Sequence, residues 1–286
     1  MALIKVGLNL ELLIETGETR ILKLVITDLD GSLLDHDSYD YSAATVALEA
    51  LSSRGIPVVF CSSKTRPELL KLREEMHNTA PYVLENGAAI GGLLHQHDAI
   101  WRQQTDDMLV LGRPRDWILG KLEKLRKRYA FQFSGFHDLS DAGVATLTGL
   151  RIEQARLARQ REFSEPLLWQ SDDKEYQNFL ECLKQEGLTA EQGGRFINIA
   201  AGCSKGAAVR KLRSLLHAPN VGDPQIIALG DSPNDASMLN EADIAVIIRS
   251  ARSKEIAASG AHKVIRTEQP GPAGWNKAIL QILNNT

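Results

Sequence analysis

The chain has 286 residues, a length that accommodates two domains of ordinary size. Hydrophobic residues make up 43% of the chain and charged residues 24%, which is typical of a globular protein. The formal net charge of −3 gives no global basic field for binding nucleic acid. No apolar run approaches the roughly 20 residues that span a bilayer, so we expect no membrane partner. The three cysteines are far apart and odd in number, which predicts a reducing, cytoplasmic environment and neither a disulfide framework nor a zinc site.

The first twenty residues precede the first strongly predicted strand and form an N-terminal extension, 1–20. Apolar residues alternate with mostly polar or small ones between Ile4 and Leu12, which predicts an extra strand. Lys5 and Glu11 interrupt the apolar run, and no small-residue cleavage site follows, so we do not interpret it as a signal peptide.

Strands and helices then alternate along most of the chain. Nearly continuous apolar runs predict buried strands, and apolar residues at helical spacing predict helices. The predicted strands are 21–30, 56–65, 81–90, 224–232 and 243–248, and the predicted helices are 42–55, 66–77, 204–217, 233–242 and 274–285. This alternation is typical of an α/β fold, a parallel sheet with right-handed crossovers.

The middle of the chain breaks this pattern. From 91 to 199 it is more charged and contains basic helical stretches such as "GKLEKLRKRY" and "QARLARQREF". We therefore predict a first domain made of 21–90 and 200–286, with a second domain, 91–199, inserted between its halves.

Polar side chains follow several predicted strands at their carboxyl ends. Ligands bind at that edge of an open parallel sheet. A lysine also begins the helix at 204–217. The residues concerned are Asp28, Asp30, Ser62, Ser63, Asn86, Asp231, Asn234, Asp235 and Lys205. Taken alone, the Asp28–Asp30 pair, "SSKT" and Lys205 are more often a turn, a helix cap or exposed surface. "GDSPNDASML" places more polar groups after its strand than a helix cap needs. Their joint placement favours a single site.

The residue types in this set suit phosphoryl transfer. Asp28 and Asp30 are two residues apart in an extended segment, so both side chains project to one side. Gly31 lets the chain leave the strand without a clash. One carboxylate can attack phosphorus as a nucleophile, and the other can act as general acid and then as general base.

A cation is needed to make such an attack favourable. Two like unit charges about 4 Å apart repel by roughly 4 kcal/mol at an effective dielectric near 20. Mg²⁺ takes oxygen ligands and bridges phosphate. Asp28 and Asp231 can supply carboxylates to it, with Asp235 joining directly or through water. Lys205 can add a fixed positive charge at the phosphate.

The remaining polar groups can hold phosphoryl oxygens. We assign this role to Ser62, with its neighbour Ser63, and to the amide of Asn234.

Four short motifs carry a family resemblance. "DLDGSLLD", "SSK", "SKG" and "GDSPND" resemble the four sequence motifs of the haloacid dehalogenase (HAD) superfamily of phosphatases. The resemblance implies a Rossmann-like core, Asp28 as nucleophile and Asp30 as acid and base. It also implies Mg²⁺ held by Asp28, the Asp30 carbonyl, Asp231 and Asp235.

The spacing of the motifs indicates the branch of this superfamily. The short stretch from Asp30 to Ser62 leaves no room for an inserted cap domain, whereas the stretch from Ser62 to Lys205 is far longer than a helix and a strand require. We therefore expect an α+β (C2-type) cap after the second motif, as in the Cof-like sugar phosphatases.

A narrower resemblance covers the chain from about Leu24 to Asn284. "SSKT", "ENGAAI", "RQREFSEP", "GGRF", "GDSPNDASML" and "PGPAGW" are similar to the mannosyl-3-phosphoglycerate phosphatase family. Two residues depart from that family: Asn198 stands where histidine is usual, and Ser204 stands where aspartate is common. Neither touches the expected chemistry, but they leave the sugar open.

The resemblance implies a substrate that carries both a phosphate and a carboxylate. Arginine forks match such groups, and Arg161 and Arg195 lie in the family-like stretches. We further expect substrate contacts from Glu165 and Lys64. The main chain at Gly193 and Gly194, and the turn residue Asn86, complete the predicted set.

Other functions remain open at this point. Glucosyl-3-phosphoglycerate or sucrose phosphate could replace the mannosyl substrate. A phosphomutase uses the same nucleophile, but usually carries its cap between the first two motifs. A receiver-like domain that only accepts a phosphoryl group is a different class, and it lacks "GDSPND" and an inserted domain. The sequence leaves the oligomeric state undetermined.

Overall fold

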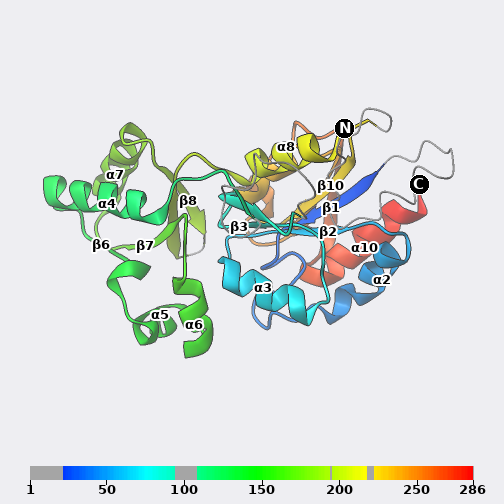
Figure 1. The fold of residues 1–286 in the computed structure, drawn as a ribbon, viewed down its shortest axis with the longest axis horizontal. Coiled ribbons are helices and arrows are strands. Elements are labelled where there is room, and N and C mark those ends of the chain that lie inside the picture. The colour runs from blue at the N-terminus through cyan, green and yellow to red at the C-terminus, as the bar shows by residue number, and fades with distance from the viewer. Residues whose placement is uncertain (1–21, 94–107, 194, 218–221, 286) are drawn as a thin grey trace.

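A computed structural model describes residues 22–93, 108–193, 195–217 and 222–285. The predicted extension 1–20 and its strand lie outside these ranges. Two lobes are visible, each built on its own sheet (Figure 1).

The larger lobe, the core, is built on an eight-stranded sheet in the order β12-β11-β10-β1-β2-β3-β4-β5. The pairs from β12 to β3 are parallel, and β4 and β5 add antiparallel strands at one edge. The strands are β1 (Lys23–Thr27), β2 (Val58–Cys61), β3 (Tyr82–Leu84), β4 (Ala89–Gly91), β5 (Met108–Val110), β10 (Gln225–Gly230), β11 (Ile244–Arg249) and β12 (Lys263–Pro270). The predicted α/β fold is confirmed.

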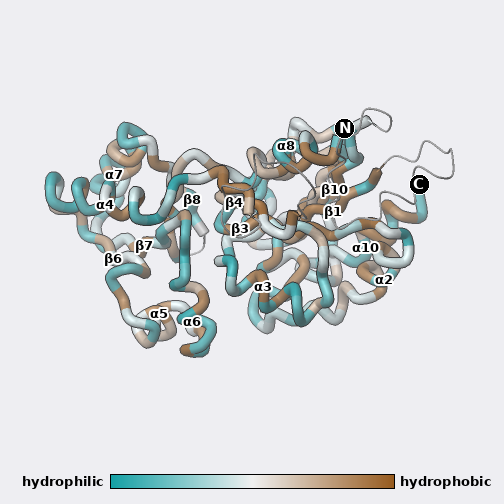
Figure 2. Tube along the Cα trace, in the orientation of Figure 1, coloured by the Kyte–Doolittle hydropathy of each residue, from teal (hydrophilic) through white to brown (hydrophobic). Residues whose placement is uncertain are grey.

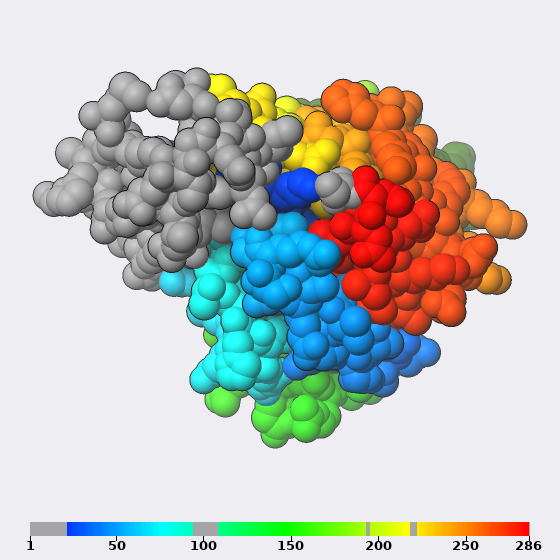
Figure 3. Space-filling model, turned by 90° about the vertical axis from the view of Figure 1, so that its right-hand side faces the viewer, coloured from blue at the N-terminus to red at the C-terminus, as the bar shows by residue number. Residues whose placement is uncertain are grey.

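Helices cover both faces of the core sheet. One face packs against α2 (Thr45–Ser53), α3 (Arg66–Glu75) and α10 (Gly271–Asn284). The other packs against α8 (Lys205–Leu216) and α9 (Ala236–Leu239). The central strands are largely apolar and buried, as Figure 2 shows at β1 and β10. The first and last helices of the core, α2 and α10, lie side by side (Figure 3).

Local sequence accounts for where these helices begin. Thr65 caps α3 by accepting from the Glu68 main chain, and the Glu68 carboxylate accepts from Thr65 N at 2.8 Å in return. Ser204 caps α8 by accepting from Ala207 N at 3.1 Å. Serine caps a helix about as well as aspartate does. The departure from the family pattern at Ser204 therefore keeps this helix start intact.

The smaller lobe, the cap, has a four-stranded antiparallel sheet in the order β6-β7-β9-β8. Its strands are β6 (Phe133–Gly135), β7 (Glu165–Trp169), β8 (Thr189–Gly193) and β9 (Phe196–Ala200). Its helices are α4 (Arg115–Tyr129), α5 (Asp141–Thr148), α6 (Ile152–Arg159) and α7 (Asp173–Gln185). One face of the sheet packs against α4 and α7.

Short 3₁₀ turns occur in both lobes. They are η1 (Ser42–Ala44), η3 (Phe136–Asp138), η4 (Pro233–Asp235) and η5 (Ser253–Glu255).

The crossing into the cap lies later than residue 91. β5 pairs with β4 in the core sheet, although the predicted cap range, 91–199, includes it. The main chains of the two crossings meet where Arg113 N donates to Ala201 O at 3.0 Å. We therefore propose 113–201 as the cap. Within the described ranges, no helix is long and apolar enough to cross a membrane.

Candidate active site

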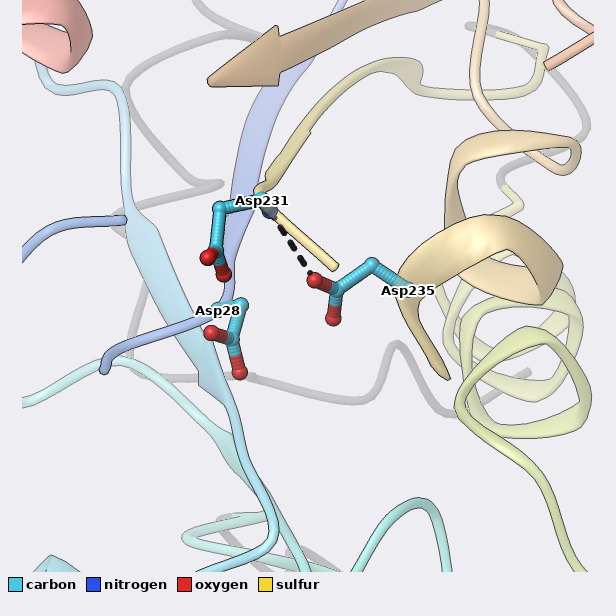
Figure 4. A group of neighbouring side chains, drawn as sticks. All are labelled: Asp28, Asp231 and Asp235. Atoms are coloured by element: carbon cyan, nitrogen blue, oxygen red, sulfur yellow. Dashed lines mark hydrogen bonds between the residues drawn. The ribbon is translucent and has the colours of Figure 1, made fainter. Parts of the chain in front are cut away.

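Three carboxylates meet at the carboxyl edge of the core sheet. β1 and β10 are parallel neighbours in the sheet, with Thr27 opposite Leu229. Asp28 and Asp231 therefore leave adjacent strands at the same edge, and η4 brings Asp235 beside them (Figure 4). Oxygen atoms from the three side chains lie within 4.8 Å of one another.

Lys205 joins two of these carboxylates. Its ammonium lies 2.6 Å from Asp28 Oδ1 and 2.6 Å from Asp235 Oδ1, and its side chain is fully buried. The predicted placement of Lys205 beside the aspartates is thus seen in the structure. A cationic group in this position also balances part of the buried negative charge.

Asp235 organises the turn that carries Asp231. Its Oδ2 accepts from Asp231 N at 3.0 Å (dashed in Figure 4) and from Ser232 N at 3.1 Å. Both of its oxygens therefore have protein partners. Gly230 permits this arrangement, because a Cβ at that position would lie 2.5 Å from Asp235 Cβ.

Gly31 allows Asp231 to approach the loop after β1. Its φ of +82° is one that side chains rarely adopt, and an added Cβ would lie 2.7 Å from Asp231 Oδ2. The predicted turn at Gly31 is confirmed. The structure adds that the Asp231 carboxylate occupies the space that a side chain at position 31 would need.

The charges at this site do not balance. Burial raises the pKa of Asp28 well above its usual value, with further upward contributions from Asp235 and Asp231 that Lys205 partly offsets. Burial, then the charge of Asp235, raises the pKa of Asp231 to about 7. One ammonium among three buried carboxylates leaves excess negative charge. An all-oxygen donor set with that excess fits a hard divalent cation such as Mg²⁺.

Asp30 lies at the open side of the cluster and pairs with Lys64. The Lys64 ammonium lies 2.8 Å from each Asp30 oxygen, and it sits 5.1 Å from the centre of the Tyr39 ring. Burial lowers the pKa of Lys64, but the Asp30 charge outweighs this and raises it. Lys64 thus lies at the site paired with Asp30, and its predicted contact with a substrate stays a prediction.

The residues predicted to hold phosphate follow β2 and β10. Ser62 is buried, and its Oγ accepts from Lys64 N at 3.2 Å. The carbonyl of Ser63 accepts from Arg161 of the cap. Asn234 Oδ1 accepts from the Ser232 hydroxyl. A phosphate role for these three residues stays a prediction.

A tryptophan near the C-terminus contacts the end of β1. The Trp275 side chain is fully buried, and its Nε1 donates to Thr27 Oγ1 at 3.0 Å. Thr27 in turn donates to the Asp28 carbonyl at 2.7 Å. "PGPAGW" therefore anchors Thr27, the residue that precedes Asp28.

Two predicted substrate ligands in the cap are engaged within the protein. Glu165 is fully buried and lies on the helix-covered face of the cap sheet, paired with Arg115 at 2.5 Å and accepting from His137 N at 2.7 Å. Arg161 donates to the Ser63 carbonyl at 2.6 Å and to Ser164 Oγ at 2.9 Å. The predicted ligand roles for these two side chains are not supported, because both are used to hold the cap together or to hold it on the core.

The other predicted substrate contacts are spread around the hairpin and the core turn. Arg195 is exposed, with its guanidinium 5.9 Å from the centre of the Phe196 ring. Gly193 ends β8, and Gly194 lies outside the described residues. Asn86 is buried beside the site, and within the described ranges its Oδ1 has no hydrogen-bond partner. That free acceptor is consistent with the predicted contact at Asn86.

Sequence reasoning missed Glu85, which joins the cap to the core. Its buried carboxylate accepts from Glu162 N at 2.8 Å, from Phe163 N at 3.1 Å and from Ser164 Oγ at 2.5 Å. Arg161 lies 3.7 Å away. Glu85 stands in "ENG" directly before Asn86, in the left-handed region with a φ of 45°. An acidic residue in a tight turn was the available signal.

Comparisons with known proteins agree with this geometry. The family described as haloacid dehalogenase-like hydrolase matches residues 25–269. A glucosyl-3-phosphoglycerate/mannosyl-3-phosphoglycerate phosphatase of Methanococcoides burtonii is 36% identical over 265 residues, covering 91% of this chain and 97% of that protein. The protein of the same name from Persephonella marina is 34% identical over 266 residues, covering 91% and 97%.

Solved structures of lower identity share the fold. The sucrose-phosphatase of Synechocystis, solved in complex with sucrose and phosphate, superposes with a TM-score of 0.61 at 17% identity. It covers 92% of this chain and 98% of that one. This likeness concerns the fold alone. From the matches along the sequence, the chain belongs to the haloacid dehalogenase-like hydrolases, in the family of the glucosyl-3-phosphoglycerate/mannosyl-3-phosphoglycerate phosphatases, and is a phosphoric monoester hydrolase.

Proposed function

We propose that this phosphatase is Mg²⁺-dependent and hydrolyses mannosyl-3-phosphoglycerate to mannosylglycerate and phosphate. The observation that carries the proposal is the buried cluster in which Lys205 bridges Asp28 and Asp235 beside Asp231. The names of the curated relatives support the substrate class. The product would be a compatible solute made in the cytoplasm, and the three free thiols suit that reducing compartment.

The first half-reaction forms an aspartyl-phosphate. The bond from Lys205 orients Asp28 so that Oδ2 attacks phosphorus. The bond between phosphorus and the glycerate oxygen breaks, and Asp30 gives its proton to that oxygen. The negatively charged substrate would draw Lys64 away from Asp30 and leave Asp30 free to act.

The second half-reaction releases phosphate. A water molecule attacks the same phosphorus and Asp30 takes one of its protons. The bond between Asp28 Oδ2 and phosphorus breaks, which restores the Asp28 carboxylate. Mg²⁺ held by the carboxylates of Asp28 and Asp231, with Asp235 behind them, would neutralise negative charge on nucleophile and phosphate. Ser62 and Asn234 would hold the phosphoryl oxygens.

The cap would exclude water during the first half-reaction and open for product release. The contact between Glu85 and residues 162–164 supports a closed state. The crossings at Arg113 and Ala201 supply the two chain segments about which the cap would move.

Phosphate release tests the proposal directly. Purified protein with Mg²⁺ is assayed on mannosyl-3-phosphoglycerate, glucosyl-3-phosphoglycerate, sucrose 6-phosphate and 4-nitrophenyl phosphate, with Asp28→Asn as the control. A preference for the mannosyl compound that the control loses is the expected result.

Glucosyl-3-phosphoglycerate is the second candidate substrate, because the curated relatives carry both sugars in their names. Comparable rates on the two would widen the substrate class and keep the mechanism. Release from neither would refute the substrate assignment. Persistence of a phospho-aspartate without turnover would instead indicate a phospho-acceptor.

A further inference from the structure

Two polar side chains of the cap, opposite each other on adjacent strands, each have a buried atom without a hydrogen-bond partner among the described residues. Glu191 on β8 pairs in register with Asn198 on β9. Among the described residues, neither Glu191 Oε2 nor Asn198 Nδ2 has a hydrogen-bond partner. A buried polar atom left unpaired costs about 1–3 kcal/mol, so the pair calls for a ligand.

The strand register places both side chains on the face of the cap sheet that lies away from α4 and α7. Ile197 and Ile199 pack with those helices. Side chains alternate along a strand, so Asn198 points to the opposite face. Cross-strand partners share a face, so Glu191 points the same way as Asn198.

That face meets the catalytic end of the core. β8 packs against η4, the turn that carries Asn234 and Asp235. Arg252 Nη1 on the core donates to Gln192 O at 3.4 Å, next to Glu191. Burial raises the pKa of Glu191, and the charges of Lys205 and Asp235 also act on it, as expected for a side chain beside the cluster.

The chemistry of the pair selects the kind of group it can bind. A carboxylate repels phosphate and the carboxylate of glycerate. An acceptor beside a donor suits an alcohol, because a hydroxyl donates and accepts at once. Neither Glu191 nor Asn198 has a part in the proposed phosphoryl transfer.

We propose that Glu191 and Asn198 bind hydroxyl groups of the sugar, with a sugar O–H donating to Glu191 Oε2 and Asn198 Nδ2 donating to a sugar oxygen. The inference rests on the proposed function and assigns the sugar part of its substrate. It also gives Asn198, which departs from the family pattern, a role in sugar specificity.

The test compares substrates with and without the sugar. Glu191→Gln and Asn198→Ala are assayed on mannosyl- and glucosyl-3-phosphoglycerate, and on 3-phosphoglycerate, which keeps the phosphate and carboxylate. Matched controls are Glu181→Gln and Asn178→Ala, at exposed positions on α7. Each site variant should lower kcat/KM on a glycosyl substrate at least tenfold more than on 3-phosphoglycerate. The controls should show no such difference.

Two outcomes would overturn the assignment. Equal losses on all substrates would mean that the pair acts on Lys205 or Asp235, and losses no larger than those of the controls would mean that it binds nothing.

The wild-type rates show separately whether the proposed function holds. If wild type does not hydrolyse either glycosyl-3-phosphoglycerate, the proposed function fails. The same variants are then compared on sucrose 6-phosphate against 4-nitrophenyl phosphate. Absence of turnover on every sugar phosphate would refute both proposals.

Discussion

Replacing Glu85 with glutamine should loosen the cap from the core. The carboxylate accepts two main-chain N–H groups and one hydroxyl from residues 162–164, at 2.5–3.1 Å. Hydrogen bonds to a charged group contribute about 1.5–3 kcal/mol each. Glutamine keeps one acceptor oxygen and points an NH₂ group at other donors. We expect the Glu85→Gln change to cost about 3 kcal/mol of the closed state, roughly 100-fold in the ratio of closed to open molecules.

Two readouts separate cap opening from general loss of stability. The amides of Glu162 and Phe163 should exchange hydrogen roughly 100-fold faster in Glu85→Gln. Spin labels at Lys71 on α3 and Arg156 on α6 should report a larger population of long distances. The amide of Ile227 in β10 should exchange at its wild-type rate.

Glu74→Gln, at an exposed position on α3, is the matched control. Faster exchange throughout the core would show that Glu85 supports the whole fold. An unchanged distance distribution would show that Glu85 does not hold the cap closed.

Three further predictions concern the carboxylate cluster and the glycine beside it. Without metal, the free energy of unfolding should fall as the pH rises from about 4 to about 7. In this range the folded protein keeps a proton on Asp231, whose pKa is about 7, and the unfolded chain has lost it, because the ordinary pKa is 3.8. The titration of Asp231 alone accounts for at most about 4 kcal/mol of this fall in unfolding free energy. Mg²⁺ should therefore raise Tm more at pH 8 than at pH 5. A metal-free Tm that rises with pH in both wild type and Asp231→Asn would contradict this prediction. Lys205→Met should lower the metal-free unfolding free energy by roughly 3–5 kcal/mol in urea titrations at pH 8, and by less at pH 5, because it leaves buried carboxylates without a counter-charge; equal losses at the two pH values would argue against the charge explanation. Gly31→Ala should lower kcat at least tenfold, because the added Cβ meets Asp231 Oδ2. The control Gly55→Ala, with a φ of +64° and open space around it, should cost only about 1–2 kcal/mol of stability through backbone strain. Equal losses of kcat in the two variants would refute the role of close packing at Gly31.

Much of the carboxylate cluster could be predicted from local patterns. Asp28 and Asp30 follow an apolar strand, and parallel strands end at one edge of their sheet, so polar residues at several strand ends had to meet. Asp235 was predicted from its place after a strand and Lys205 from its place at a helix start, and the structure brings them within 2.6 Å. The turn at Gly31 was evident because glycine there follows a strand and precedes a change of direction.

The cap depended on tertiary structure because side-chain direction there follows strand register. Glu165 and Asn198 both stand in cap strands, yet the pairing of β7 with β9 sends Glu165 to the helix-covered face and Asn198 to the other. A shift of one residue would exchange these faces. Arg161 resembled a substrate ligand until the fold placed the Ser63 carbonyl in its reach. Two further features likewise arise only when distant segments come together. They are the contacts of Glu85 with residues 162–164 and the cross-strand pairing of Glu191 with Asn198.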